Sequence, residues 1–269
     1  MMGFLLFFFL PFIASIYYSL MDSPVNGNFV GLTNYISLLK NSAFLLAGSN
    51  TLLFTLISVP LIMMIALALA LLLNRTIYFR NLIRTLFISP LVIPVASVVL
   101  VWQIVFSSSG VINGFLNFCG LDTVDWMNSG WARVVVIVVY IWKNSGYNIV
   151  LFLAGLQSIP KEYYESSQID GASAFRRFTG ITLVYLTPTS FFIFIISIIN
   201  SFKVFRETYL IAGSYPHESI YMLQHYMNNM FSSLDYQKLT TAAFIMAFFI
   251  FLLVVALFKI ERRISKAIE

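Results

Sequence analysis

The sequence predicts an all-α integral membrane protein with six transmembrane helices. Of its 269 residues, 59% are hydrophobic and only 10% are charged, whereas soluble domains carry about 25% charged residues. A soluble fold with one large core is the competing interpretation, and six apolar runs argue against it, because a crossing helix needs about 20 such residues. These runs are residues 2–20, 52–73, 86–106, 134–156, 181–199 and 242–258.

Each of the first three runs contains proline and only a few polar residues, such as the two serines of residues 2–20. Residues 2–20 have neither a basic start nor a small-residue cleavage site, so we interpret them as a membrane helix rather than a secretory signal. Residues 52–73 carry no charge and contain Pro60, which a membrane helix tolerates where neighbours satisfy the freed carbonyl. The third run has Pro90 and Pro94 near its start.

The connecting segments are polar. Residues 22–49 form a first loop, in which we expect a short surface helix at about residues 34–39. Residues 107–131 are rich in Gly, Ser, Asn and Asp and are predicted to be a loop. A polar segment at residues 157–180 separates the fourth and fifth spans, and residues 200–238 precede the sixth. No repeat of fixed period is present, so residues 1–269 are interpreted as a single transmembrane domain.

The distribution of lysine and arginine predicts the orientation. Loops on the cytoplasmic side of a membrane protein carry the excess of basic residues. Lys143 falls inside a span, and five basic residues occupy one set of loops. We therefore expect both termini and residues 157–180 in the cytoplasm, together with the ten basic residues of the other set: Arg75, Arg80, Arg84, Lys161, Arg176, Arg177, Lys259, Arg262, Arg263 and Lys266.

The segment of residues 162–188, EYYESSQIDGASAFRRFTGITLVYLTP, has an informative internal order. Pro160 and the acidic residues after it suit the first turn of a short helix. Gly171 can adopt backbone angles that other residues avoid, so it is expected to end that helix. Ser173 is a suitable N-cap for a second short helix. Two short helices at an angle form a projection that another protein could grip.

This segment resembles the cytoplasmic coupling loop of permease subunits of binding-protein-dependent ABC importers. Their pattern is roughly E-A-A, three residues, G, and then an apolar helix with a proline. Both alanines are serines here, and a proline often found near residue 184 is absent. The sequences FLAGLQSIPKE (152–162) and FVGLTNY (29–35) resemble the sugar-type branch, similar to maltose and glycerol-phosphate permeases. The coupling residues that the resemblance implies are Glu165, Ser166, Ser167, Asp170, Gly171 and Ala172, with Pro188 at the closing proline.

The resemblance, which extends over about residues 4–260, implies a permease of the ABC importer type. It would import a sugar, with an oligosaccharide favoured and an acidic sugar as an open alternative. The implied partners are a second permease, usually a different chain in this branch, two ATPase subunits and an extracytoplasmic solute-binding protein. ATP and Mg would bind the ATPase subunits, since this chain has no phosphate-binding loop of the G-x-x-x-x-G-K-[ST] type. We expect no cofactor and no catalytic activity in this chain, and a location in a bacterial-type cell membrane. Family members usually have a basic segment before the first helix, which leaves open whether residues precede Met1.

The fourth span carries a polar stripe. Lys143 lies near its middle, where a charge costs about 2.5–3.5 kcal/mol on insertion scales and must face the bundle interior or water. Asn144, Tyr147 and Asn148 extend the stripe. It either lines a transport path or forms hydrogen bonds between helices. The resemblance to maltose-type permeases implies path-lining positions at Asn144, Tyr147, Asn200, Ser201, Val204 and, as a weaker match, Ser97.

Three charged residues, Lys203, Arg206 and Glu207, follow the fifth span. Lys203 and Glu207 are four residues apart and can pair on one helix face, which would make this segment a solvated helix end. Alternatively, Lys203 and Arg206 attract an acidic group on the substrate, because arginine suits carboxylates. Both interpretations stay open.

Two other classes of protein compete with the importer. An ion-coupled secondary transporter of a small polar solute would carry acidic residues in its spans, and none of the six runs contains one. A membrane-embedded enzyme would need a nucleophile with a base, and no run holds a histidine. His217 and His225 lack acidic partners at ligand spacing, and Cys119 is the only cysteine, so no metal site is expected.

Overall fold

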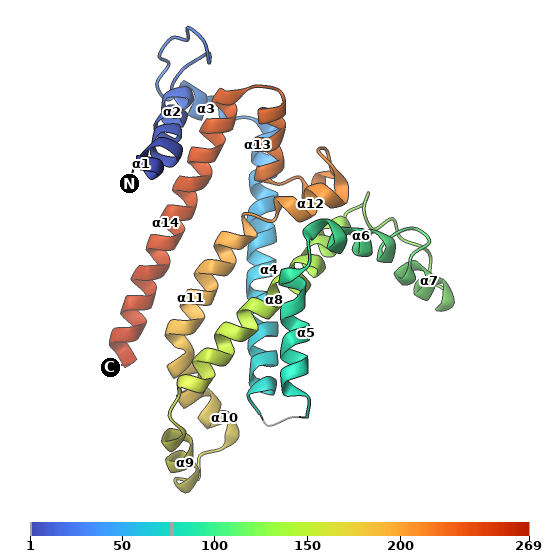
Figure 1. Ribbon diagram of the computed structural model, residues 1–269, viewed down its shortest axis with the longest axis vertical. Helices are drawn as coiled ribbons and strands as arrows, with labels where there is room; N and C mark the ends of the chain where they lie inside the picture. Colours follow the sequence, from blue (N-terminus) through green and yellow to red (C-terminus); the bar gives the residue numbers. More distant parts are fainter. Residues whose placement is uncertain (1, 76–77, 269) are drawn as a thin grey trace.

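The structure, a computed structural model, describes residues 2–75 and 78–268, and its regular secondary structure there is helical (Figure 1). The one β-type pairing among these residues is an isolated bridge between Met21 and Phe29. The all-α prediction is therefore confirmed. Four helical stretches are long and apolar enough to cross a membrane: α4 (Ser42–Asn74), α8 (Ala132–Ser158), the stretch Ala174–Ala212 that contains α11 (Leu183–Ser201), and most of α14 (Tyr236–Ile268).

Two of the six predicted spans are not simple crossing helices. Residues 2–20 form three short consecutive helices, α1 (Met2–Phe4), η1 (Leu5–Phe9) and α2 (Leu10–Ser19). Residues 86–106, predicted as one span, are divided between α5 (Arg80–Val92) and α6 (Val95–Val105), which meet at a bend of 102°. The described residues thus provide four spans, or five if the bent pair crosses as one.

Proline explains the bend in the third segment. Pro94 precedes α6, and Ile93 before it has the extended backbone that a residue preceding proline prefers. Pro94 also lacks the N–H that would continue the hydrogen-bond ladder of α5. Pro60 and Pro90 lie inside α4 and α5 without dividing them.

Short helices connect the long ones: α3 (Thr33–Leu38), α7 (Val111–Phe118), α9 (Lys161–Ile169), α10 (Ala174–Arg177), η2 (Phe178–Thr182), α12 (Phe205–Ala212), η3 (Glu218–Ile220) and α13 (Leu223–Ser232). The loop predicted at residues 107–131 thus contains a helix. The buried Asn113 holds this segment together, since its Oδ1 accepts from the backbone N–H of Val124 at 3.0 Å and from Trp126 Nε1 at 3.1 Å. A polar composition alone does not reveal that one asparagine is buried.

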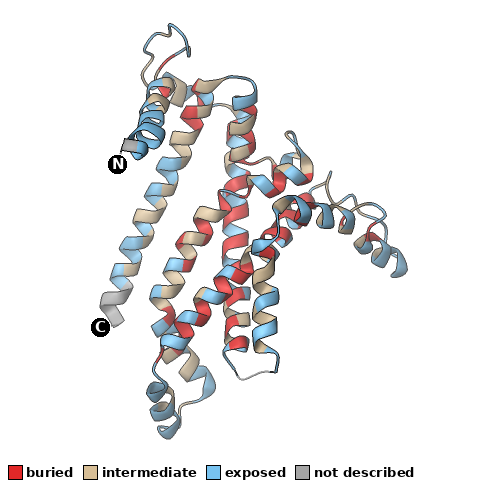
Figure 2. Ribbon diagram, in the orientation of Figure 1, coloured by how far each residue is buried: buried red, intermediate tan, exposed pale blue. Residues whose placement is uncertain are grey.

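The core lies between α4 and α8, where the buried residues concentrate (Figure 2). Ala66 and Ala70 of α4 are completely buried against Phe152 and Leu156 of α8. Small side chains let membrane helices approach closely, and dispersion contacts between them then replace contacts with lipid. Helix α14 lies at the periphery with most of its residues partly or fully exposed (Figure 2).

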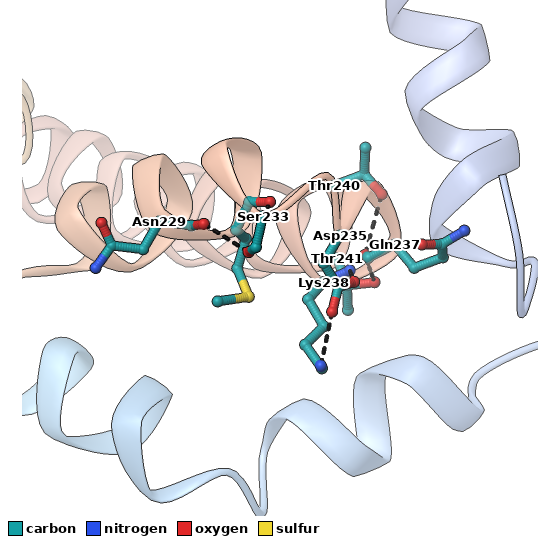
Figure 3. Close-up of polar contacts among 8 residues, drawn as sticks. Asn229, Ser233, Asp235, Gln237, Lys238, Thr240 and Thr241 are labelled. Carbon is teal, nitrogen blue, oxygen red and sulfur yellow. Dashed lines mark hydrogen bonds and ion pairs between the residues drawn. The ribbon is translucent and has the colours of Figure 1, made fainter.

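A tight turn connects α13 to α14 (Figure 3). Leu234 has a left-handed backbone, with φ of 60°. Asp235 accepts from the backbone N–H of Lys238 at 3.1 Å and pairs with its Nζ at 2.7 Å. Thr240 and Thr241 direct their hydroxyls to carbonyls one turn earlier in α14, so neither hydroxyl lacks an acceptor in the apolar helix.

His225 of α13 is completely buried, and we therefore expect the stability of the chain to depend on pH. Burial lowers the pKa of His225 to about 4, against about 6.5 in an unfolded chain. The unfolded state therefore binds a proton that the folded state rejects, so stability falls as the pH drops from about 6.5 towards 4, by on the order of 3 kcal/mol. Thermal unfolding in detergent across this range measures the effect. His225→Gln should flatten the profile and His217→Gln should not; two equal profiles would contradict the assignment.

Candidate functional site

A pocket of about 350 Å³ opens between α5, α8 and α11. Its lining combines apolar and polar side chains: Leu91, Tyr140, Asn144, Tyr147, Asn148, Ile196, Ser197 and Asn200. Three residues that the sequence assigned to a path, Asn144, Tyr147 and Asn200, therefore lie together although they come from two helices. The volume is within the range of small-molecule sites.

Some polar groups of the pocket connect helices. Asn148 Nδ2 donates to Ser197 Oγ at 3.1 Å, and Tyr140 Oη donates to the Ser197 carbonyl at 3.1 Å. These two bonds fix α8 against α11. Asn148 thus fits the alternative that its stripe forms hydrogen bonds between helices. Tyr140 and Ser197 were missed by sequence reasoning, although they lie four residues before Asn144 and three before Asn200, on the same helix faces.

Other polar groups of the pocket are available to a ligand. Asn144 donates its Nδ2 to the Tyr140 carbonyl at 2.9 Å, which leaves its carbonyl oxygen free. Within residues 2–75 and 78–268, no side-chain hydrogen bond engages the Tyr147 hydroxyl or the Asn200 amide. The Tyr147 side chain is exposed and Asn200 is half-buried. The pocket thus offers an amide, a carbonyl oxygen and a hydroxyl to polar groups of a bound molecule.

Lys143 forms an ion pair with Glu207 of α12 beside this pocket. The two side chains are only 13% and 11% exposed, so both charges are largely removed from solvent. Lys143 therefore does not point into the pocket. The Lys203–Glu207 pairing that the sequence offered is not formed, because Glu207 turns inward to α8 while Lys203 is exposed.

The other predicted path residues lie outside the pocket. Ser201 is buried and bonds Thr55 of α4 at 2.8 Å, and Val204 is buried in the cluster around Phe54, so both pack α11 and its continuation against α4. Ser97 lines a separate, mainly apolar pocket of about 430 Å³ near the α5–α6 bend. Arg206, like Lys203, is exposed, and neither has an acidic partner among the described residues.

The segment between α8 and α11 has the predicted two-helix form. Helix α9 ends in a hydrogen-bonded turn: the N–H of Gly171 bonds the Gln168 carbonyl at 3.1 Å, and the N–H of Ala172 bonds the Ser167 carbonyl at 2.9 Å. This C-terminal motif requires a left-handed residue, and Gly171 has φ of 74°. Ser173 then caps α10 by accepting from the Arg176 N–H at 3.3 Å. The predicted turn and cap are confirmed.

The same segment projects from one end of the bundle (Figure 1). Tyr164 bonds Thr182 at 2.9 Å, and the Tyr163 and Tyr185 rings stack 5.0 Å apart, which fixes α9 to the base of α11. The predicted coupling residues Glu165, Ser166, Asp170 and Gly171 are exposed, and Ser167 and Ala172 are partly buried in the turn. Ile169 and Phe175 here are 88% and 76% exposed, and large exposed apolar side chains in one segment are typical of a protein contact.

A bundle of apolar helices with a polar pocket between them and a projection at one end is the arrangement expected of a membrane transport component. The chain belongs to the family described as the binding-protein-dependent transport system inner membrane component, whose model matches residues 58–268. The family assignment made from the coupling-loop residues is therefore confirmed.

Two of the curated relatives are named as permeases of sugar-transport systems. The arabinooligosaccharide permease AraP of Halalkalibacterium halodurans is 38% identical over 197 residues, which cover 71% of this chain and 62% of AraP. The match thus spans less than two thirds of AraP. The trehalose/maltose permease MalF of Thermococcus litoralis is 34% identical over 190 residues, covering 70% of this chain and 64% of MalF. Both relatives are named as transport permeases, which is consistent with a non-catalytic chain.

A solved structure has the same fold over nearly the whole chain. A bacterial ABC transporter involved in import of the acidic polysaccharide alginate contains a chain that superposes with a TM-score of 0.86. It shares 26% sequence identity and covers 98% of this chain and 92% of its own. A second crystal structure shows the bacterial alginate transporter in complex with an alginate pentasaccharide-bound periplasmic protein.

Proposed function

We propose that this chain is a transmembrane permease subunit of an ATP-driven, binding-protein-dependent importer of a sugar. The observation that carries the proposal is the pocket between α8 and α11, in which Asn144, Tyr147 and Asn200 present free amide and hydroxyl groups. Sugars are recognised by groups of this kind, because each hydroxyl of the sugar both donates and accepts hydrogen bonds.

An oligosaccharide is the favoured substrate. AraP and MalF are named for arabinooligosaccharides and for trehalose and maltose, and the solved neighbour for alginate. An acidic sugar remains an alternative, to which Lys203 and Arg206 would contribute exposed positive charge just beyond Asn200. A sugar pocket shared with a second permease would accommodate a ligand longer than one ring.

In the proposed topology, the chain crosses the membrane six times. The helices of residues 2–19 form the first span and the bent pair α5–α6 the third. Support comes from the placement of the basic residues: the C-terminal end of α4, the N-terminal end of α5, the α9–α10 projection and the C-terminal end of α14 lie at the same end of the bundle (Figure 1). Both termini and the projection would then be cytoplasmic in a bacterial-type cell membrane.

Coupling to ATP hydrolysis is proposed to occur at the α9–α10 projection. Two ATPase subunits, which carry ATP and Mg, would grip this projection and that of a second permease, while the extracytoplasmic binding protein delivers the sugar at the opposite end. Glu165 would pair with a basic group of the ATPase, and the exposed Ile169 and Phe175 would enter an apolar recess. Movement of the projection would then open the pocket alternately to the two sides of the membrane.

The test is a pull-down from mildly solubilised membranes. The native chain should retain an ATPase subunit and a second permease, and a Glu165→Arg, Gly171→Trp variant should lose the ATPase alone. The matched control is Gly120→Trp, Asp122→Arg, which makes the same changes at an exposed acid and an exposed glycine of positive φ far from the projection. Absence of an ATPase from every sample would favour the ion-coupled transporter, and its loss from the control as well would remove the coupling role of α9–α10.

A further inference from the structure

Two arginines share one neutral partner at the junction of α5 and α8. Arg80 begins α5, Arg84 lies one turn further along, and Gln157 is near the end of α8. With the Gln157 amide oriented so that its oxygen faces them, Oε1 accepts from Arg80 Nη2 at 3.1 Å and from Arg84 Nη2 at 3.0 Å. Two guanidinium groups therefore converge on a single uncharged oxygen.

This cluster has no compensating negative charge among the described residues. Both ion pairs found there, Lys143–Glu207 and Lys238–Asp235, lie elsewhere, so no described carboxylate is within 4.0 Å of either guanidinium. The Nε atoms of Arg80 and Arg84 are buried and make no hydrogen bond. Two like charges at this separation repel each other, and a buried donor without a partner costs free energy. The two positive charges of the cluster are therefore not balanced by any described carboxylate.

The cluster lies where a membrane protein meets lipid headgroups. The apolar helix α4 ends at Asn74, and α5 begins at Arg80, so the cluster marks the end of two membrane helices. Immediately before it, Tyr78 and Phe79 expose 95% and 75% of their surface. Exposed aromatic rings are enriched at the membrane–water interface. At that depth the most abundant anions are lipid phosphates, and basic pockets between membrane helices bind such headgroups.

We propose that Arg80, Arg84 and Gln157 bind the phosphate of an anionic phospholipid. Two guanidinium groups can each offer paired donors to phosphate oxygens, which suits arginine better than lysine. The bound phosphate would neutralise the repulsion between Arg80 and Arg84 and bridge α5 to α8. Because Leu91 of α5 and Tyr147 of α8 line the same pocket, the lipid would also stabilise the junction that carries the pocket.

The experiment places the complete chain, with the subunits that accompany it, in nanodiscs of phosphatidylcholine with or without phosphatidylglycerol. Native mass spectrometry counts retained lipids, and thermal unfolding measures stability. The native chain should retain phosphatidylglycerol and unfold at a higher temperature when it is present. Arg80→Gln, Arg84→Gln should lose both effects, whereas the matched pair Arg262→Gln, Arg263→Gln, which removes two exposed arginines from α14, should keep them.

Further arms separate the sources of the anion. Gln157→Glu supplies a carboxylate to both arginines, so it should raise stability in phosphatidylcholine and abolish retention of phosphatidylglycerol even if the arginine variant fails to fold. An equal shift with inorganic phosphate would overturn the lipid assignment in favour of a free anion. Loss of phosphatidylglycerol from the α14 control as well would show that lipid retention depends on the net charge of the chain and not on this cluster. If neither phosphatidylglycerol nor inorganic phosphate raises the unfolding temperature while Gln157→Glu does, the anion at this site is a carboxylate of another subunit, and the lipid proposal is overturned.

Discussion

Replacing Lys143 by methionine is expected to lower the free energy of unfolding by about 3–5 kcal/mol, because Glu207 is then left buried without its partner. The large effect comes from the stranded carboxylate, which must either stay charged in a poorly solvated place or take up a proton. The quantity to measure is the unfolding midpoint of the purified chain in detergent.

The exposed pair Lys238–Asp235 provides the matched control (Figure 3). Its lysine side chain is 51% exposed, and pairs of this kind contribute at most about 1 kcal/mol. Lys238→Met should therefore shift the midpoint far less than Lys143→Met. Equal shifts for the two variants would show that the Lys143–Glu207 pair is as weak as a surface pair.

The double variant Lys143→Met, Glu207→Leu measures the interaction energy between the two residues separately from the effect of replacing each one. Replacing a buried ion pair by apolar residues of similar size is often neutral or stabilising, so the double variant should be more stable than Lys143→Met alone. Lys143→Arg should also retain most of the stability, since it preserves the charge. A double variant that simply adds the two single losses would mean that Lys143 and Glu207 do not interact energetically.

The partner of Lys143 illustrates what sequence reasoning could not reach. The cost of a charge inside a span predicted only that Lys143 faces the bundle interior or water, and its partner Glu207 is 64 residues away along the chain. Local spacing offered Lys203, four residues before Glu207, as one possible partner of that carboxylate. Glu207 pairs with Lys143 rather than Lys203 because α12 crosses α8 in the folded chain. No periodicity in the sequence predicts that crossing.

Local features were predicted more reliably because they depend on neighbouring residues. Gly171 ends α9 in a left-handed conformation and Ser173 caps α10, as the sequence predicted. The proline-containing third span shows the limit of such rules. Pro90 lies within a helix and Pro94 lies at a 102° bend, although both are prolines in an apolar run. Only Pro94 stands at the break, after the extended Ile93 that follows α5, whereas Pro90 is accommodated within α5.

The close approach of α5 to α8 leads to the second large effect, at Gly146. A Cβ added there would lie 2.0 Å from the Phe87 carbonyl oxygen and 3.1 Å from the Ile88 Cα, and backbone atoms cannot rotate away. Gly146→Ala must therefore push the helices apart, and overpacking of this kind costs about 1–3 kcal/mol. Because Leu91 and Tyr147 lie on either side of this junction, the pocket between them should change shape as well.

Two other glycines provide a ranked comparison for the Gly146 prediction. At Gly155 the added Cβ would meet side-chain atoms of Leu186 and Thr189 at 2.8 Å, which can shift, so Gly155→Ala should cost less. At Gly114 of α7 nothing lies within 4 Å, and Gly114→Ala should be neutral or slightly stabilising through helix propensity. The expected order of unfolding midpoints is Gly114→Ala above Gly155→Ala above Gly146→Ala, and the sugar uptake proposed for this chain should be lost first in Gly146→Ala. A Gly146→Ala chain as stable and active as the native one would mean that α5 and α8 do not touch there, and the pocket that their contact shapes would lose its wall.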